Sequence, residues 1–148
     1  MSEYRYTESG LDNVIIEGVS FVRDDNGESV IRIPYVNGLH KAIACGIVMR
    51  HSMMNGKEMR FLRSEMGMTQ AELADMIHRE PLTVSRWERG ETEIDQNAET
   101  LIRLHAIEQL KLMVECEVSE ISAWCIPSAV LQPIRIDGRD PRNYQLAA

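Results

Sequence analysis

Apolar positions alternate with polar ones in the first part of the chain and then change to a helical period. Val14–Val22 is rich in valine, isoleucine and phenylalanine with partial alternation, and Ser29–Val36 is again rich in β-branched residues. Asp24–Gly27 lies between these stretches and is a strong turn signal, so the pattern predicts a β-hairpin. Residues 1–10 are polar and predict a flexible end.

The Asn37-Gly38 pair is expected to end the second strand and to precede a helix over Leu39–His51. The apolar residues of this stretch recur at helical spacing, and they are Leu39, Ile43, Ile47 and Val48. A two-stranded hairpin is marginal in isolation. We therefore expect it to pack on this helix, on the next domain or on a second copy of itself.

Helix signals follow in quick succession between residues 55 and 114. Asn55 has Glu58 three positions on, and Thr69 with Glu72 forms a capping box, in which each side chain can satisfy the other residue's exposed backbone N–H. The remaining signals are Gly67 and Gly90 as helix ends, Pro81 in a first turn, and Asp95 as the cap of a helix that runs to about Val114. Together they predict four helices between residues 56 and 114.

Beyond Val118 the signals weaken. Proline and glycine interrupt the last segment at Pro127, Pro133, Gly138 and Pro141. Within it, Val130–Ile136 is expected to be either an extended arm or a strand.

The chain as a whole is acidic, with 16 lysine and arginine residues against 23 aspartate and glutamate residues and a net charge of −7. This surplus opposes general affinity for nucleic acid, because attraction to phosphate needs local positive charge. Residues 50–90 nevertheless carry 7 basic and 6 acidic side chains, whereas residues 1–49 and 91–148 have net charges of −3 and −5. The middle segment is therefore compatible with DNA binding on one face.

The chain has three cysteines, Cys45, Cys116 and Cys125, and no two of them form a CxxC pair. The absence of such a pair and the odd number are typical of a reduced intracellular protein. No apolar run reaches the ~18 residues of a membrane span. The N-terminus lacks the basic and apolar regions of a signal peptide. We therefore expect a cytoplasmic protein.

Two short helical stretches joined by a turn, Thr69–Ala74 and Thr83–Gly90, carry the most specific motif. The first opens with Thr-Gln and has Leu-Ala in its middle, and the second reads Thr-Val-Ser-Arg-Trp-Glu-Arg-Gly. From about Gly56 to Leu104, a third of the chain, the sequence resembles the helix-turn-helix of the Xre/Cro/phage-repressor family. The resemblance implies a lambda-repressor-like fold and sequence-specific DNA binding.

Helical spacing gives the proposed recognition helix, Leu82–Arg89, two faces. One face holds Val84, Trp87 and Glu88 and can pack on Leu73, Ala74 and Ile77, whereas Leu82, Ser85, Arg86 and Arg89 project from the other. An arginine there can make a bidentate contact to guanine O6 and N7 in the major groove. Leu82 can contact a thymine methyl, and Thr83 and Ser85 can bond to bases or phosphates.

The resemblance also implies roles for single residues. Gln70, at the start of the first motif helix, looks like a phosphate-contacting residue. Arg86 and residues 81–83 fall where relatives read bases, and Arg89 falls near a phosphate contact. These positions form the predicted DNA-binding surface.

Two further positions have structural roles by the same resemblance, and several depart from the family pattern. Arg63 and Glu88 match a pair that relatives use as an internal salt bridge. His78 stands where relatives usually have glycine, and a non-glycine residue with positive φ carries strain. Arg79 replaces a small apolar residue and can add a phosphate contact. Polar base-reading residues are replaced by Pro81 and Leu82, so readout is expected to depend on Thr83, Arg86 and DNA shape.

A second resemblance lies in Tyr4–Val14, which reads Tyr-Arg-Tyr-Thr-Glu-Ser-Gly-Leu-Asp-Asn-Val. This stretch is similar to one in the MqsA-type antitoxins, which join a small zinc-binding N-terminal module to an Xre-type helix-turn-helix. Their zinc module uses paired CxxC motifs, which this chain lacks, so we predict no structural zinc. The four histidines share no metal-ligand spacing, and no cofactor is expected.

The expected fold is mainly α, a lambda-repressor-like helix-turn-helix domain with a small N-terminal β-hairpin and helix module (α+β). The module is expected over residues 1–54 and to serve dimerisation or partner binding. The DNA-binding domain is expected over residues 55–115, and a C-terminal extension or arm over residues 116–148.

The leading functional hypothesis is a dimeric transcriptional repressor that regulates its own promoter and binds a double-stranded DNA operator. Its recognition helices would reach half-sites about one turn, ~34 Å, apart. The alternative is an antitoxin whose acidic segments bind a basic toxin protein, and both can hold. An enzyme is disfavoured, since no nucleophile elbow, P-loop, HExxH motif or paired catalytic carboxylates occur.

Overall fold

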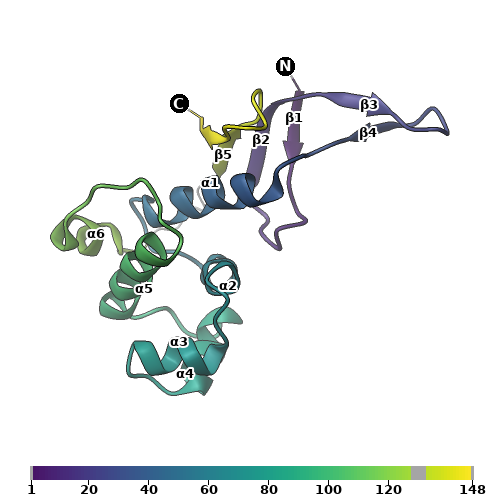
Figure 1. Ribbon diagram of the computed structural model, residues 1–148. Helices are drawn as coiled ribbons and strands as arrows, with labels where there is room; N and C mark the ends of the chain where they lie inside the picture. The colour runs from purple at the N-terminus through teal and green to yellow at the C-terminus, as the bar shows by residue number, and fades with distance from the viewer. Residues whose placement is uncertain (1, 128–132, 148) are drawn as a thin grey trace. The chain divides into compact units, whose positions relative to one another are not determined.

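The computed structural model describes residues 2–127 and 133–147 (Figure 1), and its contacts divide them into two units. The N-terminal unit comprises residues 2–43 together with residues 133–147, and the helical unit comprises residues 44–127. The end of the chain is therefore grouped with its beginning, whereas the sequence suggested three consecutive segments. Helix α1 (Val36–Val48) contributes residues to both units.

The N-terminal unit contains a four-stranded sheet. Its strands are β1 (Ser2–Arg5), β2 (Val14–Val19), β5 (Ile134–Asp137) and β6 (Gln145–Leu146), in the order β1-β2-β5-β6. The pairing of β2 with β5 is parallel, and the other two pairings are antiparallel. The expectation of a flexible N-terminus is wrong, because residues 2–5 form the β1 strand. The Val130–Ile136 stretch includes a strand from Ile134, while its residues 130–132 lie outside the described residues.

Alternation in β2 and β5 explains this pairing. Val14 and Ile16 are fully buried and lie opposite Ile134 and Ile136, which are buried as well. Burying a side chain of this size contributes about 1.5–3 kcal/mol. Arg135 lies between Ile134 and Ile136, and its side chain is on the other face of the sheet. It forms ion pairs with Glu3 on β1 at 3.1 Å and Glu17 on β2 at 3.0 Å.

A separate two-stranded sheet is formed by β3 (Phe21–Arg23) and β4 (Ser29–Ile31). The turn predicted at Asp24–Gly27 is present: the Asp24 carboxylate accepts from the Asn26 and Glu28 amides, each at 2.9 Å, and Gly27 is left-handed with φ of 79°. The hairpin predicted over residues 14–36 is nevertheless wrong in extent, because Val14–Val19 pairs with β1 and β5 instead of with β4.

Helix α1 starts at Val36, so the Asn37-Gly38 pair lies inside the helix instead of ending a strand. The strand already ends at Ile31, and Tyr35, the residue before the helix, is left-handed with φ of 58°. The apolar positions predicted for this helix are all fully buried, and they are Leu39, Ile43, Ile47 and Val48. In the N-terminal unit, His40 Nε2 on this helix also lies 2.9 Å from the Tyr6 hydroxyl.

The helical unit contains the four helices predicted between residues 56 and 114, which are α2 (Gly56–Glu65), α3 (Gln70–Met76), α4 (Pro81–Glu88) and α5 (Gln96–Gln109). Asn55, Thr69 and Asp95 accept the capping hydrogen bonds expected of them, and Pro81 is the first residue of its helix. Helix α5 ends before Val114, because Lys111 adopts a left-handed conformation with φ of 52°. A further helix, α6 (Val118–Trp124), was not expected.

No helix in the described ranges is both long enough and apolar enough to cross a membrane.

Candidate nucleic-acid interface

Helices α3 and α4 pack against each other and are joined by a tight turn (Figure 1). The Thr69 hydroxyl and the Glu72 carboxylate cap α3 reciprocally, with both hydrogen bonds at 3.1 Å. At its other end, His78 is left-handed with φ of 58°, and the Arg79 amide donates to the Ala74 carbonyl at 2.9 Å. This is a Schellman motif built on histidine instead of glycine. The turn fixes the direction in which the chain enters α4.

Helix α4 has one buried face and one exposed face. Val84 and Trp87 are 0% and 4% exposed. The sequence predicted that they pack on Leu73, Ala74 and Ile77 of the preceding helix and its C-cap, and these three residues are buried too. The opposite face presents Leu82, Arg86 and Arg89 as exposed side chains and Thr83 and Ser85 as half-buried ones. An accessible apolar, hydroxyl and cationic surface of one helix is the arrangement that major-groove readout requires.

A charged clamp, formed by Arg63, Glu88 and Gln70, connects α4 to the neighbouring helices. The Arg63 guanidinium donates to both oxygens of Glu88, from Nε at 2.6 Å and from Nη2 at 2.9 Å, and also to the Met68 carbonyl at 2.9 Å. Gln70 joins the clamp by donating to Glu88 Oε1 at 3.1 Å. The hydrogen bonds to Glu88 raise the pKa of Arg63. Together with Gln70, the pair connects α2, the start of α3 and the end of α4.

Gly56 provides a contact that the sequence did not reveal. A Cβ atom at this first residue of α2 would lie 2.2 Å from the Trp87 carbonyl oxygen and 2.6 Å from that of Glu88. Since both obstacles are backbone atoms, only glycine allows α2 to approach the last turn of α4 this closely. The sequence contained no signal for it beyond the glycine itself.

The arginines around α4 differ in how far they are engaged within the protein. Arg79 pairs with Asp95 at 2.5 Å, and Arg89 bonds to Ser85 at 2.8 Å and to Glu91 at 3.1 Å. These side chains are exposed, and exposed ion pairs exchange for other partners at little cost. Within the part of the chain that the structure describes, Arg86 makes no hydrogen bond or ion pair. Its guanidinium is therefore the cation of α4 most directly available to a ligand.

The helical unit also contains a buried charged cluster centred on Arg103. This side chain is fully buried and donates to Glu99, at 2.5 Å for the shortest contact, and to three carbonyls, those of Val48, Arg50 and Ser52. Arg50 in turn pairs with the fully buried Glu58. Arginine here satisfies three carbonyls at the end of α1 and in the following loop, and buried backbone carbonyls need a donor.

Sequence reasoning missed this cluster because an arginine in an amphipathic helix is usually solvated. The four-residue spacing of Glu99 and Arg103 was the available signal. Burial raises the pKa of the Glu99 carboxyl, against the opposing effect of Arg103. Burial also raises the pKa of the neighbouring Cys125 thiol, to about 11.

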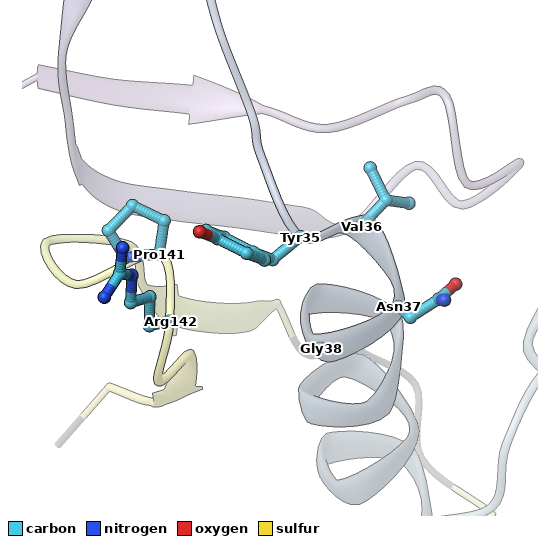
Figure 2. Close-up of a pocket in the computed structure, with 6 residues that line it drawn as sticks. All are labelled: Tyr35, Val36, Asn37, Gly38, Pro141 and Arg142. Carbon is cyan, nitrogen blue, oxygen red and sulfur yellow. The ribbon is translucent and has the colours of Figure 1, made fainter.

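In the N-terminal unit, a hollow of about 470 Å³ lies at the start of α1 (Figure 2). It is lined by Tyr35, Val36, Asn37, Gly38, Pro141 and Arg142, and the Tyr35 ring extends toward Pro141. Over the described ranges, no three histidine, cysteine or acidic side chains gather where they could hold a metal ion. The Tyr4–Val14 stretch forms the end of β1, a loop and the start of β2.

Comparison with known proteins agrees with this geometry. A family model described as helix-turn-helix matches residues 59–106, which run from α2 to α5 and include the clamp and both motif helices. No curated protein and no solved structure matches the chain. Residues 59–106 therefore form a helix-turn-helix domain of the Xre/Cro type, the kind of domain with which transcription regulators bind DNA.

Proposed function

We propose that the chain is a dimeric transcriptional repressor that acts on its own promoter and reads its operator with α4. The observation that supports this most directly is the exposed face of α4, where Arg86 is accessible beside Leu82 and the half-buried Thr83. A repressor of this kind needs no further activity, because a dimer bound over a promoter excludes polymerase. Two copies would reach half-sites about 34 Å apart on one side of the duplex.

Base readout and backbone contact are assigned to different side chains. Arg86 is proposed to contact guanine, a bidentate interaction that gives about 1–3 kcal/mol of discrimination. Gln70 uses one amide hydrogen on Glu88, so the second remains for a phosphate oxygen. Arg89 and Arg79 would exchange their exposed carboxylate partners for phosphates.

These assignments predict two kinds of effect on binding to a selected operator. Arg86→Ala should relax base preference at one position of each half-site and cost about 1–3 kcal/mol there. Gln70→Ala and Arg89→Ala should weaken binding to operator and random DNA alike. Arg142→Ala, which removes an exposed arginine outside the motif, is the matched control.

The experiment begins with selection of bound sequences from a random DNA pool, followed by fluorescence anisotropy on the winning site at fixed salt. A footprint with two-fold symmetry is expected. Unchanged affinity and selectivity in all three motif variants would disprove the assignment of the recognition face. A reporter fused to the DNA upstream of the reading frame tests repression, and expression that does not fall when the chain is supplied would contradict it.

A further inference from the structure

The β3–β4 hairpin comprises residues 21–31 (Figure 1), and every one of them is exposed or half-buried. Its apolar residues Phe21, Val22 and Val30 are 49%, 44% and 38% exposed. Among the described residues its sheet has two strands, separate from the four-stranded sheet of the same unit. A two-stranded hairpin with exposed valine and phenylalanine is marginal by itself. Its free edges are sites where another strand can add.

Along β4, backbone groups that bond to β3 alternate with groups that face outward, and the turn shows which residues are which. The Asp24 amide donates to the Glu28 carbonyl at 2.9 Å and its carbonyl accepts from the Gly27 amide at 3.0 Å, so residue 24 occupies a hydrogen-bonded position opposite a bulge at residues 27 and 28. Such positions alternate along an antiparallel ladder. Val22 and Val30 are therefore the next hydrogen-bonded pair, and the amides and carbonyls of Ser29 and Ile31 point away from β3.

We propose that a second copy of the chain adds to this edge, with β4 running antiparallel to the β4 strand of the second copy about a two-fold axis at Val30. Ser29 of each copy then exchanges hydrogen bonds with Ile31 of the other. The two hairpins become one four-stranded sheet. The existence of a dimer is part of the proposed function, and the surface that makes it is assigned here.

Charge selects this register. With the axis at Val30, Glu28 of each copy lies directly opposite Arg32 of the other, in a non-hydrogen-bonded pair whose side chains are close. An axis at Ser29 would place Glu28 opposite Val30, and an axis at Ile31 would place Arg32 opposite Val30. Registers shifted by a single residue would join outward-facing backbone groups to inward-facing ones, so they lose the ladder.

The same register completes an apolar row. Val22 lies opposite Val30 within each hairpin, so four valines align across the joined sheet in the order 22, 30, 30, 22. Cross-strand pairs of β-branched residues stabilise a sheet. Opposite charges placed symmetrically about Val30 are complementary to themselves, which favours a second copy over an unrelated strand.

Charge reversal tests the pairing on the full chain, without DNA. Glu28→Arg and Arg32→Glu each place like charges opposite one another twice per dimer. Each should raise the dimer dissociation constant about tenfold or more in sedimentation velocity experiments. An equimolar mixture of these two variants should associate again as a heterodimer, and the double variant should associate with itself. Asp25→Arg, an equal charge change at the exposed hairpin tip, should leave the dissociation constant unchanged.

Crosslinking gives an independent readout of the axis. In Val30→Cys, the two cysteines would belong to a non-hydrogen-bonded pair with Cα atoms about 4.5 Å apart, a distance that a disulfide can span. Oxidation should therefore produce covalent dimers. Val22→Cys, on the same face but separated by two strands in the joined sheet, should not do so.

The interface is disproved if the wild-type chain is a monomer at tens of micromolar, if the mixed variants stay monomeric, or if only a heterologous protein pairs with the edge. These results do not depend on DNA. A chain that binds its operator while both reversal variants dimerise normally would overturn the interface and leave the proposed function intact.

Discussion

The Arg63–Glu88 clamp should contribute more to the stability of the helical unit than the other arginine pairs around α4. The test is Arg63→Met, which keeps much of the aliphatic stem and removes the guanidinium. Glu88, whose side chain is only 4% exposed, then loses both charged hydrogen bonds and keeps Gln70. A carboxylate left in the interior without its cation is costly because its charge is poorly solvated there.

The magnitude follows from burial. Breaking a fully buried pair costs about 3–5 kcal/mol, and exposed pairs contribute about 0–1 kcal/mol. The Arg63 side chain is 14% exposed, so we expect about 3 kcal/mol, which corresponds to a fall of about 12–24 °C in melting temperature for a unit of this size. Arg89→Met breaks the Arg89–Glu91 pair, where both side chains are 53% exposed, and should cost less than about 1 kcal/mol.

Urea unfolding followed by tryptophan fluorescence reports on this unit specifically, since both tryptophans, Trp87 and Trp124, lie within it. The double variant Arg63→Met/Glu88→Gln removes the carboxylate charge that Arg63→Met leaves unpaired. It should lose less stability than the two single variants together, with a coupling of about 1 kcal/mol or more. Equal losses for Arg63→Met and Arg89→Met, or strictly additive effects in the cycle, would refute the reasoning.

Three further predictions follow from single positions. Gly56→Ala should cost about 2–4 kcal/mol, because its Cβ would clash with the Trp87 carbonyl at 2.2 Å, whereas Gly38→Ala, where the nearest atom is 3.8 Å away, should be neutral or stabilising in thermal unfolding. His78→Gly should stabilise the chain by about 0.5–1 kcal/mol in urea titrations, since it relieves a left-handed non-glycine residue, and a loss of stability would show that the histidine side chain contributes more than its backbone strain costs. Burial raises the folded-state pKa of Cys125 from 9.0 to about 11, so its contribution is complete below pH 9 and is lost as pH rises toward 11; the unfolding free energy should fall more steeply over that window in the wild type than in Cys125→Ala.

Local signals accounted for most of the helical unit. Asn55, Thr69 and Asp95 were recognised as caps because a side-chain acceptor beside an apolar helical pattern satisfies exposed amides whatever the rest of the chain does. The buried face of α4 followed from helical spacing in the same way. Such features depend on neighbours within a few residues, and these neighbours are visible in one sequence.

The N-terminal unit was harder to predict because its sheet is built from distant segments. Val14–Val19 pairs with residues 134–137, more than a hundred positions away, and no local pattern distinguishes this partner from the nearby Ser29–Val36. A hairpin signal at Asp24–Gly27 was real but produced strands of three residues each. The strand in this region with the strongest alternation was therefore assigned to the wrong neighbour.

Arg103 shows a different limit. Its position on α5 suggested a solvated side chain, yet it is fully buried because the end of α1 leaves carbonyls that require a donor. The requirement arises only when two helices far apart in sequence meet. The spacing to Glu99 was consistent with a pair, but it did not reveal that both residues are interior.

The ion pairs of the arginines reduce the positive charge that the segment around the motif can offer to DNA. Residues 50–90 contain seven basic side chains, but Arg50 and Arg63 neutralise internal carboxylates, and Arg79 and Arg89 hold exposed ones. A single domain therefore offers DNA few cations at no cost, and its affinity for one half-site should be modest. Two linked domains turn the second contact into an intramolecular one and multiply affinity without new contacts. On this reasoning the proposed pairing of two copies through the edge of β4 would be as important for operator binding as the recognition helix itself.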